Sequence, residues 1–114
     1  MLNGSYIGFR RLDISPFTAV KIRLRSSSDW VSITVTQESP DSEPIGFVKV
    51  DIPEVENRWN LDDKDWFDIE IPLSPNPGIH DLYFICHSDR SEADLIYFDI
   101  CQLEWLEFIP YFDN

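Results

Sequence analysis

Regular alternation of apolar and polar residues is the feature that most restricts the fold of this chain. Residues 18–25, TAVKIRLR, alternate aliphatic side chains with cations over their whole length. Successive side chains of a β-strand point to opposite faces, so the segment predicts a half-buried strand. The aliphatic face holds Val20, Ile22 and Leu24, and the solvent face holds Lys21, Arg23 and Arg25.

The same alternation occurs in residues 30–37, WVSITVTQ, and in residues 67–73, FDIEIPL. In the first of these, Ser32, Thr34 and Thr36 are predicted to face outward. Turn-forming segments rich in Pro, Gly, Ser, Asn and Asp separate the strands, and no segment has a sustained helical stripe. The pattern predicts an all-β fold, an antiparallel β-sandwich or jelly roll. At 114 residues, the chain (1–114) is expected to form one domain.

Two later segments, residues 79–86 and 95–108, are apolar on both faces. This pattern is typical of central strands that are covered on each side, and also of strands with one face in a binding surface. Both interpretations stay open from the sequence.

The formal net charge of -12 excludes a nucleic-acid partner, because binding phosphates needs a face rich in Lys and Arg. No run of about 18 apolar residues exists, so no membrane-spanning segment is predicted. The first ten residues, MLNGSYIGFR, lack the apolar segment of a signal peptide.

Catalysis is not predicted. His80 and Asp81 are adjacent, so in a strand they face opposite ways and form no dyad by themselves. His87 lies near a turn, and neither Cys86 nor Cys101 has a recognisable catalytic setting. His80 and Asp81 are expected to make structural hydrogen bonds.

The two cysteines, Cys86 and Cys101, fit a disulfide, a pair of buried thiols, or chance. If their two segments are antiparallel neighbours joined by HSDRSEAD, the sulfurs would lie close together. The acidic group Asp62, Asp63 and Asp65 has two interpretations, a cation site and a solvated turn; it lacks the spacing of an EF-hand loop.

Five segments in order resemble the strands of family 6 carbohydrate-binding modules. They are GSYIGFRRLDI, SPDSEPIGFVKV, a tryptophan before an alternating strand, PGIHDLYFIC and ICQLEWLEF, which together span Gly4 to Phe108. The resemblance implies a jelly-roll β-sandwich that binds a polysaccharide or oligosaccharide without chemistry. It also implies a secreted, cell-surface or periplasmic protein attached to a glycoside hydrolase or related enzyme.

Members of that family hold a sugar ring between two aromatic side chains. By this resemblance Trp66 is one of the pair, and Phe9 or Tyr6 is the other, with Phe9 preferred. Because Tyr6 and Phe9 point to opposite faces of a strand, only one of them is expected to reach the cleft. Gln102 matches the family's asparagine and is predicted to bind the sugar through its longer amide arm.

Glu104 matches an aspartate that helps to hold a structural calcium ion in the family, and it can supply the same kind of oxygen ligand. The family's first strands, which carry the other calcium ligands, have no counterpart here. The domain is therefore predicted to be N-terminally incomplete, or completed by another chain or domain.

The sequence thus predicts a noncatalytic polysaccharide-binding module that holds an attached enzyme near its substrate. The alternative is a β-sandwich interaction or assembly module with no affinity for sugars. Sugar binding predicts Trp66 exposed in a cleft, whereas assembly predicts it buried beside an unpaired strand edge.

Overall fold

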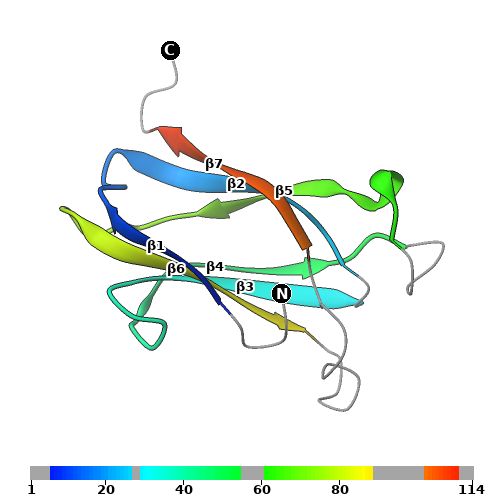
Figure 1. Cartoon of the computed structure of the whole chain (residues 1–114), viewed down its shortest axis with the longest axis horizontal. Coiled ribbons are helices and arrows are strands. Elements are labelled where there is room, and N and C mark those ends of the chain that lie inside the picture. The colour runs from blue at the N-terminus through cyan, green and yellow to red at the C-terminus, as the bar shows by residue number, and fades with distance from the viewer. Residues whose placement is uncertain (1–5, 27–28, 55–60, 89–101, 111–114) are drawn as a thin grey trace.

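Two antiparallel sheets stacked face to face form the fold of the computed structural model (Figure 1). The structure describes residues 6–26, 29–54, 61–88 and 102–110. The strands are β1 Tyr6–Leu12, β2 Phe17–Arg25, β3 Trp30–Gln37, β4 Pro44–Asp51, β5 Phe67–Pro72, β6 His80–Ser88 and β7 Gln102–Pro110, with a short 3₁₀ helix, η1, at Asp63–Asp65.

Within these residues, one sheet has the order β1-β6-β3-β4 and the other has the order β5-β2-β7. Every strand pair is antiparallel. The predicted antiparallel β-sandwich is confirmed, and its strands follow the alternating segments of the sequence closely.

The core lies between the sheets and consists mainly of the alternating aliphatic residues. On β2, the cations occupy the outer face as predicted, while the aliphatic residues are completely buried. The largest buried side chains are Phe84, Ile14, Ile22, Leu24, Ile71 and Leu82. Burial of such side chains, at about 1.5 to 3 kcal/mol each, supplies the main favourable term in folding.

The pairing of the last two strands differs from the sequence expectation. β6 lies centrally between β1 and β3, whereas β7 lies in the other sheet, where it pairs with β2. The two strands are therefore not neighbours. Among the described strands β7 is at an edge, and the exposed carboxylates Glu104 and Glu107 on it are typical of solvated edge strands.

Outward polar residues of β3 are more buried than the alternation predicts. Ser32 and Thr36 point to the outer face but are buried, and only Thr34 is partly exposed. The turn after β3 accounts for Thr36, because its hydroxyl donates a hydrogen bond to the carbonyl of Ser39. In the part of the chain that the structure describes, no helix is long and apolar enough to cross a membrane.

Candidate functional site

A β-bulge in β1 places two arginines side by side on the protein surface. Phe9 pairs with Leu82 and Leu12 pairs with His80, so two residues of β1 oppose only Asp81 of β6. The extra residue restores the inward direction of Leu12 and leaves both Arg10 and Arg11 exposed.

The backbone of the bulge is strained and is held by a carboxylate. Arg11 has a φ of 58°, in the left-handed region that residues other than glycine rarely adopt. Its backbone N–H donates a 3.1 Å hydrogen bond to Asp81 Oδ1. Asp81 also accepts a hydrogen bond at its carbonyl from Glu38 N, at 2.9 Å, so β6 anchors both β1 and the turn after β3.

A pocket of about 250 Å³ opens on the outer face of β1 and β6, next to the bulge. We call it the tyrosine pocket; its lining is formed by Tyr6, Gly8, Phe9, Arg10 and Tyr83. The rings of Tyr6 and Tyr83 meet edge to face, with centroids 5.3 Å apart and planes at 83°. Two aromatic surfaces at right angles therefore form a corner.

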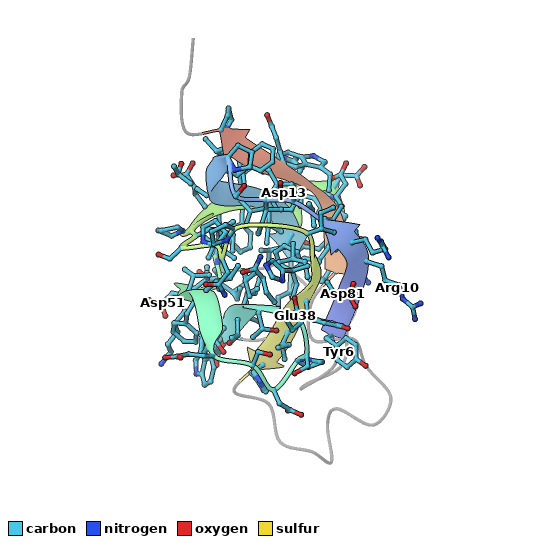
Figure 2. All side chains as sticks on the ribbon, turned by 90° about the vertical axis from the view of Figure 1, so that its left-hand side faces the viewer. Tyr6, Arg10, Asp13, Glu38, Asp51 and Asp81 are labelled. Atoms are coloured by element: carbon cyan, nitrogen blue, oxygen red, sulfur yellow. The ribbon has the colours of Figure 1, made fainter. Side chains whose placement is uncertain are left out.

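Gly8 makes room for one wall of this corner. A Cβ atom at Gly8 would lie 3.0 Å from Cε1 and 3.1 Å from Cδ1 of Tyr83, closer than side chains normally approach. The ring of Tyr83 thus rests over the strand at the position that a side chain would occupy. Tyr6 is 54% exposed, so its ring is open to a ligand. Figure 2 shows Tyr6 and Arg10 along β1, with Asp51 of β4 on the opposite side of the molecule.

Tyr6 and Phe9 do point to opposite faces, as the alternation predicts. Tyr6 faces outward, whereas the Phe9 ring packs edge to face against Phe84, with a centroid distance of 6.0 Å. Phe9 is partly buried against the core and only contributes to the lining of the pocket. The exposed ring is therefore Tyr6, not the preferred Phe9.

Trp66 and Gln102 come together at another place, through Arg25. The guanidinium carbon of Arg25 lies 4.4 Å from the centroid of the Trp66 ring. Arg25 Nε donates a 2.8 Å hydrogen bond to Gln102 Oε1. Trp66 is half-buried, and the cation covers one of its faces. This exposure is intermediate between the values that the sugar-binding and assembly hypotheses predict, so it does not separate them.

Glu104, the predicted calcium ligand, is paired with a cation of the protein itself. Its Oε2 accepts a 3.0 Å hydrogen bond from Arg23 Nε, and Arg23 also binds Asp68. Among the described residues, no group of three or more His, Cys, Asp or Glu side chains is arranged to hold a metal ion. The described contacts of Glu104 are with Arg23, and the calcium ion stays a prediction from the resemblance.

The acidic group before Trp66 forms a cap on η1. Asp62 Oδ1 accepts a 2.9 Å hydrogen bond from Lys64 N, and Asp65 Oδ2 accepts one of the same length from Asp62 N. This is a reciprocal capping box, which satisfies backbone donors at the start of the turn. The geometry agrees with the solvated-turn interpretation.

His80 and Asp81 make structural hydrogen bonds, as expected. His80 Nδ1 contacts the Glu38 carboxylate, and Nε2 lies 2.7 Å from the carbonyl oxygen of Pro77. The hydrogen bond with Glu38, followed by that with Pro77, raises the pKa of His80 above its usual value of 6.5. Because both ring nitrogens face acceptors, the protonated imidazolium fits this site.

Cys86 lies on the inward face of β6 and is 1% exposed. Cys101 lies outside the described residues, so the disulfide stays a prediction.

Sequence reasoning did not select Tyr83, Gly8 or Arg10 for the site. Tyr83 lies in the apolar segment 79–86, for which the sequence left both a covered strand and a binding surface open. The available signal was the register of β1 and β6, which brings Gly8 opposite Tyr83, but strand alternation within one segment does not reveal it.

No protein-family model matches the sequence, and no curated protein matches it. Solved structures do match it over nearly its whole length. A family 6 carbohydrate-binding module from Clostridium cellulolyticum in complex with xylose is 20% identical, with a TM-score of 0.71 over 95% of this chain and 74% of that one. A β-1,3-glucan-binding family 6 module from Bacillus halodurans is 17% identical, with a TM-score of 0.71 over 96% and 72%.

The chain has the fold of family 6 carbohydrate-binding modules. The resemblance inferred from the five sequence segments is thus confirmed at the level of the fold. A glycoside hydrolase family 43 arabinoxylan arabinofuranohydrolase from Bacillus subtilis, in complex with cellotetraose, is 19% identical, with a TM-score of 0.73. The match covers 96% of this chain but spans only a fifth of the length of that enzyme.

Proposed function

We propose that this domain is a noncatalytic carbohydrate-binding module that binds a sugar in the tyrosine pocket. The observation that supports this most directly is the corner formed by the rings of Tyr6 and Tyr83. It is open on the outer face and bordered by the side chain of Arg10. The CH-rich face of a pyranose ring stacks well on an aromatic surface, while a few polar contacts fix its orientation.

The fold comparisons support the class of ligand. Structures with this fold are described in complex with cellobiose, with xylose, or as binding β-1,3-glucan. By analogy, an oligosaccharide or polysaccharide is the expected ligand here, and an attached glycoside hydrolase or a second chain is the expected partner. A secreted or cell-surface location would follow from such a substrate.

The proposal and the sequence hypothesis place the sugar on different aromatic residues. At the site predicted from the resemblance, Arg25 covers one face of Trp66, so a sugar there would have to use the other face or displace the cation. The tyrosine pocket needs no such rearrangement, because Tyr6 is already exposed.

Affinity electrophoresis against a panel of xylans, β-glucans, cello-oligosaccharides and acidic polysaccharides tests the proposal. Replacement of Tyr83 by Ala is expected to weaken binding about tenfold or more, since stacked aromatic contacts of this kind contribute roughly 1 to 2 kcal/mol including their buried area. Phe47→Ala is the control, because Phe47 is an aromatic residue that is 58% exposed on β4, outside the lining of the pocket. It should leave binding unchanged.

A Trp66→Ala variant distinguishes the two locations. A loss of binding in Trp66→Ala with none in Tyr83→Ala would move the site to Trp66 and Gln102. If the folded wild-type protein binds none of the polysaccharides, sugar binding is wrong for this domain and the assembly alternative gains support.

A further inference from the structure

The arginines beside the tyrosine pocket differ from Lys21 and Arg23 of β2 in having no acidic partner among the described residues. On β2, Lys21 lies 3.9 Å from Asp68, and Arg23 binds both Asp68 and Glu104. Within the described residues, neither the Arg10 nor the Arg11 guanidinium forms an ion pair with a carboxylate. In a chain of net charge -12, two exposed cations without a partner are an unusual local surplus of positive charge.

The bulge adds Arg11 to the outer face on which Arg10 already lies, next to the pocket. In a regular strand, Arg10 would face outward, but Arg11 would point inward and Leu12 outward. The bulge, with its left-handed backbone at Arg11, exposes Arg11 as well. Bulges of this kind commonly re-aim side chains beside binding sites. Arg10 itself lines the tyrosine pocket, and Figure 2 shows its side chain extending away from the sandwich next to β1.

Nearby carboxylates among the described residues form no ion pair with the two arginines. Asp81 Oδ1 accepts the backbone N–H of Arg11, and the Glu38 carboxylate contacts His80. Neither Asp81 nor Glu38 lines the pocket. The side of the pocket formed by Arg10 therefore offers hydrogen-bond donors of positive charge next to an aromatic corner.

We propose that the tyrosine pocket binds acidic glycans, with the aromatic corner on the sugar ring and the Arg10 guanidinium on a carboxylate or sulfate group of that glycan. This inference rests on the proposed function and narrows its ligand class. A guanidinium matches such anionic groups with two parallel hydrogen bonds. The negative charge of the rest of the protein repels a polyanion, so binding requires this local site and does not arise from general attraction.

The test compares the wild-type protein with Arg10→Gln and Arg11→Gln, using oligogalacturonate, a sulfated galactan, and neutral xylo- and cello-oligosaccharides as titrants in calorimetry. Wild type is expected to bind an acidic oligosaccharide more tightly than its neutral counterparts. Arg10→Gln should weaken that binding about tenfold, since hydrogen bonds to charged groups contribute roughly 1.5 to 3 kcal/mol, and should weaken binding of neutral sugars less, because these offer no anionic group to the guanidinium. If only one of the two acidic titrants binds, it identifies the anionic group of the ligand as a carboxylate or a sulfate.

Lys21→Gln is the matched control, because it removes one exposed positive charge from the β2 face. An equal loss of affinity in Lys21→Gln would mean that only net charge matters, and would overturn the inference. Binding of neutral sugars without preference for acidic ones, unchanged in Arg10→Gln, would also overturn it while leaving the proposed function intact. Absence of binding to every sugar would instead remove both.

Discussion

The two edges of the four-stranded sheet are built in opposite ways. At β4 the sheet closes on β5: Ser74 N donates a 2.8 Å hydrogen bond to the Ile45 carbonyl, and a Cβ at Gly46 would lie only 2.9 Å from the Pro72 carbonyl oxygen. At β1, the other edge among the described strands, a bulge, exposed arginines and the tyrosine pocket face outward.

A glycine makes room at each edge, but for different neighbours. Gly46 leaves space for the Pro72 carbonyl and the Leu73 side chain, so it allows the two sheets to pack closely. Gly8 leaves space for the ring of Tyr83, so it shapes the tyrosine pocket on the outer face. β4 therefore packs against the opposite sheet, whereas the outer face of β1 stays open to a ligand.

The same substitution at the two glycines should therefore have different consequences. Gly46→Val is expected to lower the free energy of unfolding by about 2 to 3 kcal/mol, because backbone atoms must move to admit the side chain. Gly8→Val should cost far less stability, because the Tyr83 ring can rotate away and valine favours a strand. Urea unfolding of both variants measures the two values.

Sugar binding by the same pair supplies the second half of this test. Gly8→Val displaces the Tyr83 ring and should abolish retention in affinity electrophoresis, whereas folded Gly46→Val should still be retained. If Gly8→Val loses as much stability as Gly46→Val, the β1 edge is also part of the framework and the contrast between the edges fails.

Much of this architecture could be predicted from the sequence, since the period-two segments determine which residues face the core. The inward residues of β2 and β3 and the outward cations of β2 follow directly from that period. The strand neighbours do not follow from it: β6 and the last strand share an apolar character but lie in different sheets. Pairing depends on contacts between distant segments, which the local pattern does not encode.

The site was harder to predict for the same reason. Tyr6 was identified as a candidate, but its partner Tyr83 depends on the register between β1 and β6. The positions of Trp66 and Gln102 were inferred from the resemblance, and the structure adds Arg25 between them, a contact that no spacing in the sequence reveals. The bulge at Arg10 and Arg11 likewise replaces simple alternation with two consecutive exposed residues.

Relief of strain at the bulge should have a smaller effect than the glycine substitutions, and of opposite sign. Arg11→Gly removes a left-handed conformation that costs about 1 to 2 kcal/mol for residues other than glycine, against a loss of about 0.5 to 1 kcal/mol from the greater freedom of the unfolded chain. The net expectation is a gain of roughly 0.5 to 1 kcal/mol in the free energy of unfolding, measured by urea denaturation.

The matched comparison is Arg23→Met on β2, where the cation has two acidic partners. That variant should lose about 0.5 kcal/mol, as is usual for surface ion pairs. If Arg11→Gly is less stable than wild type, the arginine side chain has a structural partner and the bulge is not held at a cost in stability.

The smallest effect concerns His80, at the end of the β1–β6 pairing, whose ring contacts Glu38 and the carbonyl of Pro77. Its pKa is raised in the folded state, first by Glu38 and then by Pro77, so its contribution to stability is fully present below the unfolded pKa of 6.5 and is lost as the pH rises through the folded pKa. The difference in free energy of unfolding between wild type and His80→Gln should therefore be larger at about pH 5.5 than at about pH 8.5. Carboxylates elsewhere titrate equally in both proteins and cancel from that difference.

His87→Gln, which alters a second histidine on the same strand, is the control. A difference that is independent of pH for His80→Gln, or equally pH-dependent for His87→Gln, would mean that the charged imidazolium of His80 does not stabilise this part of the fold.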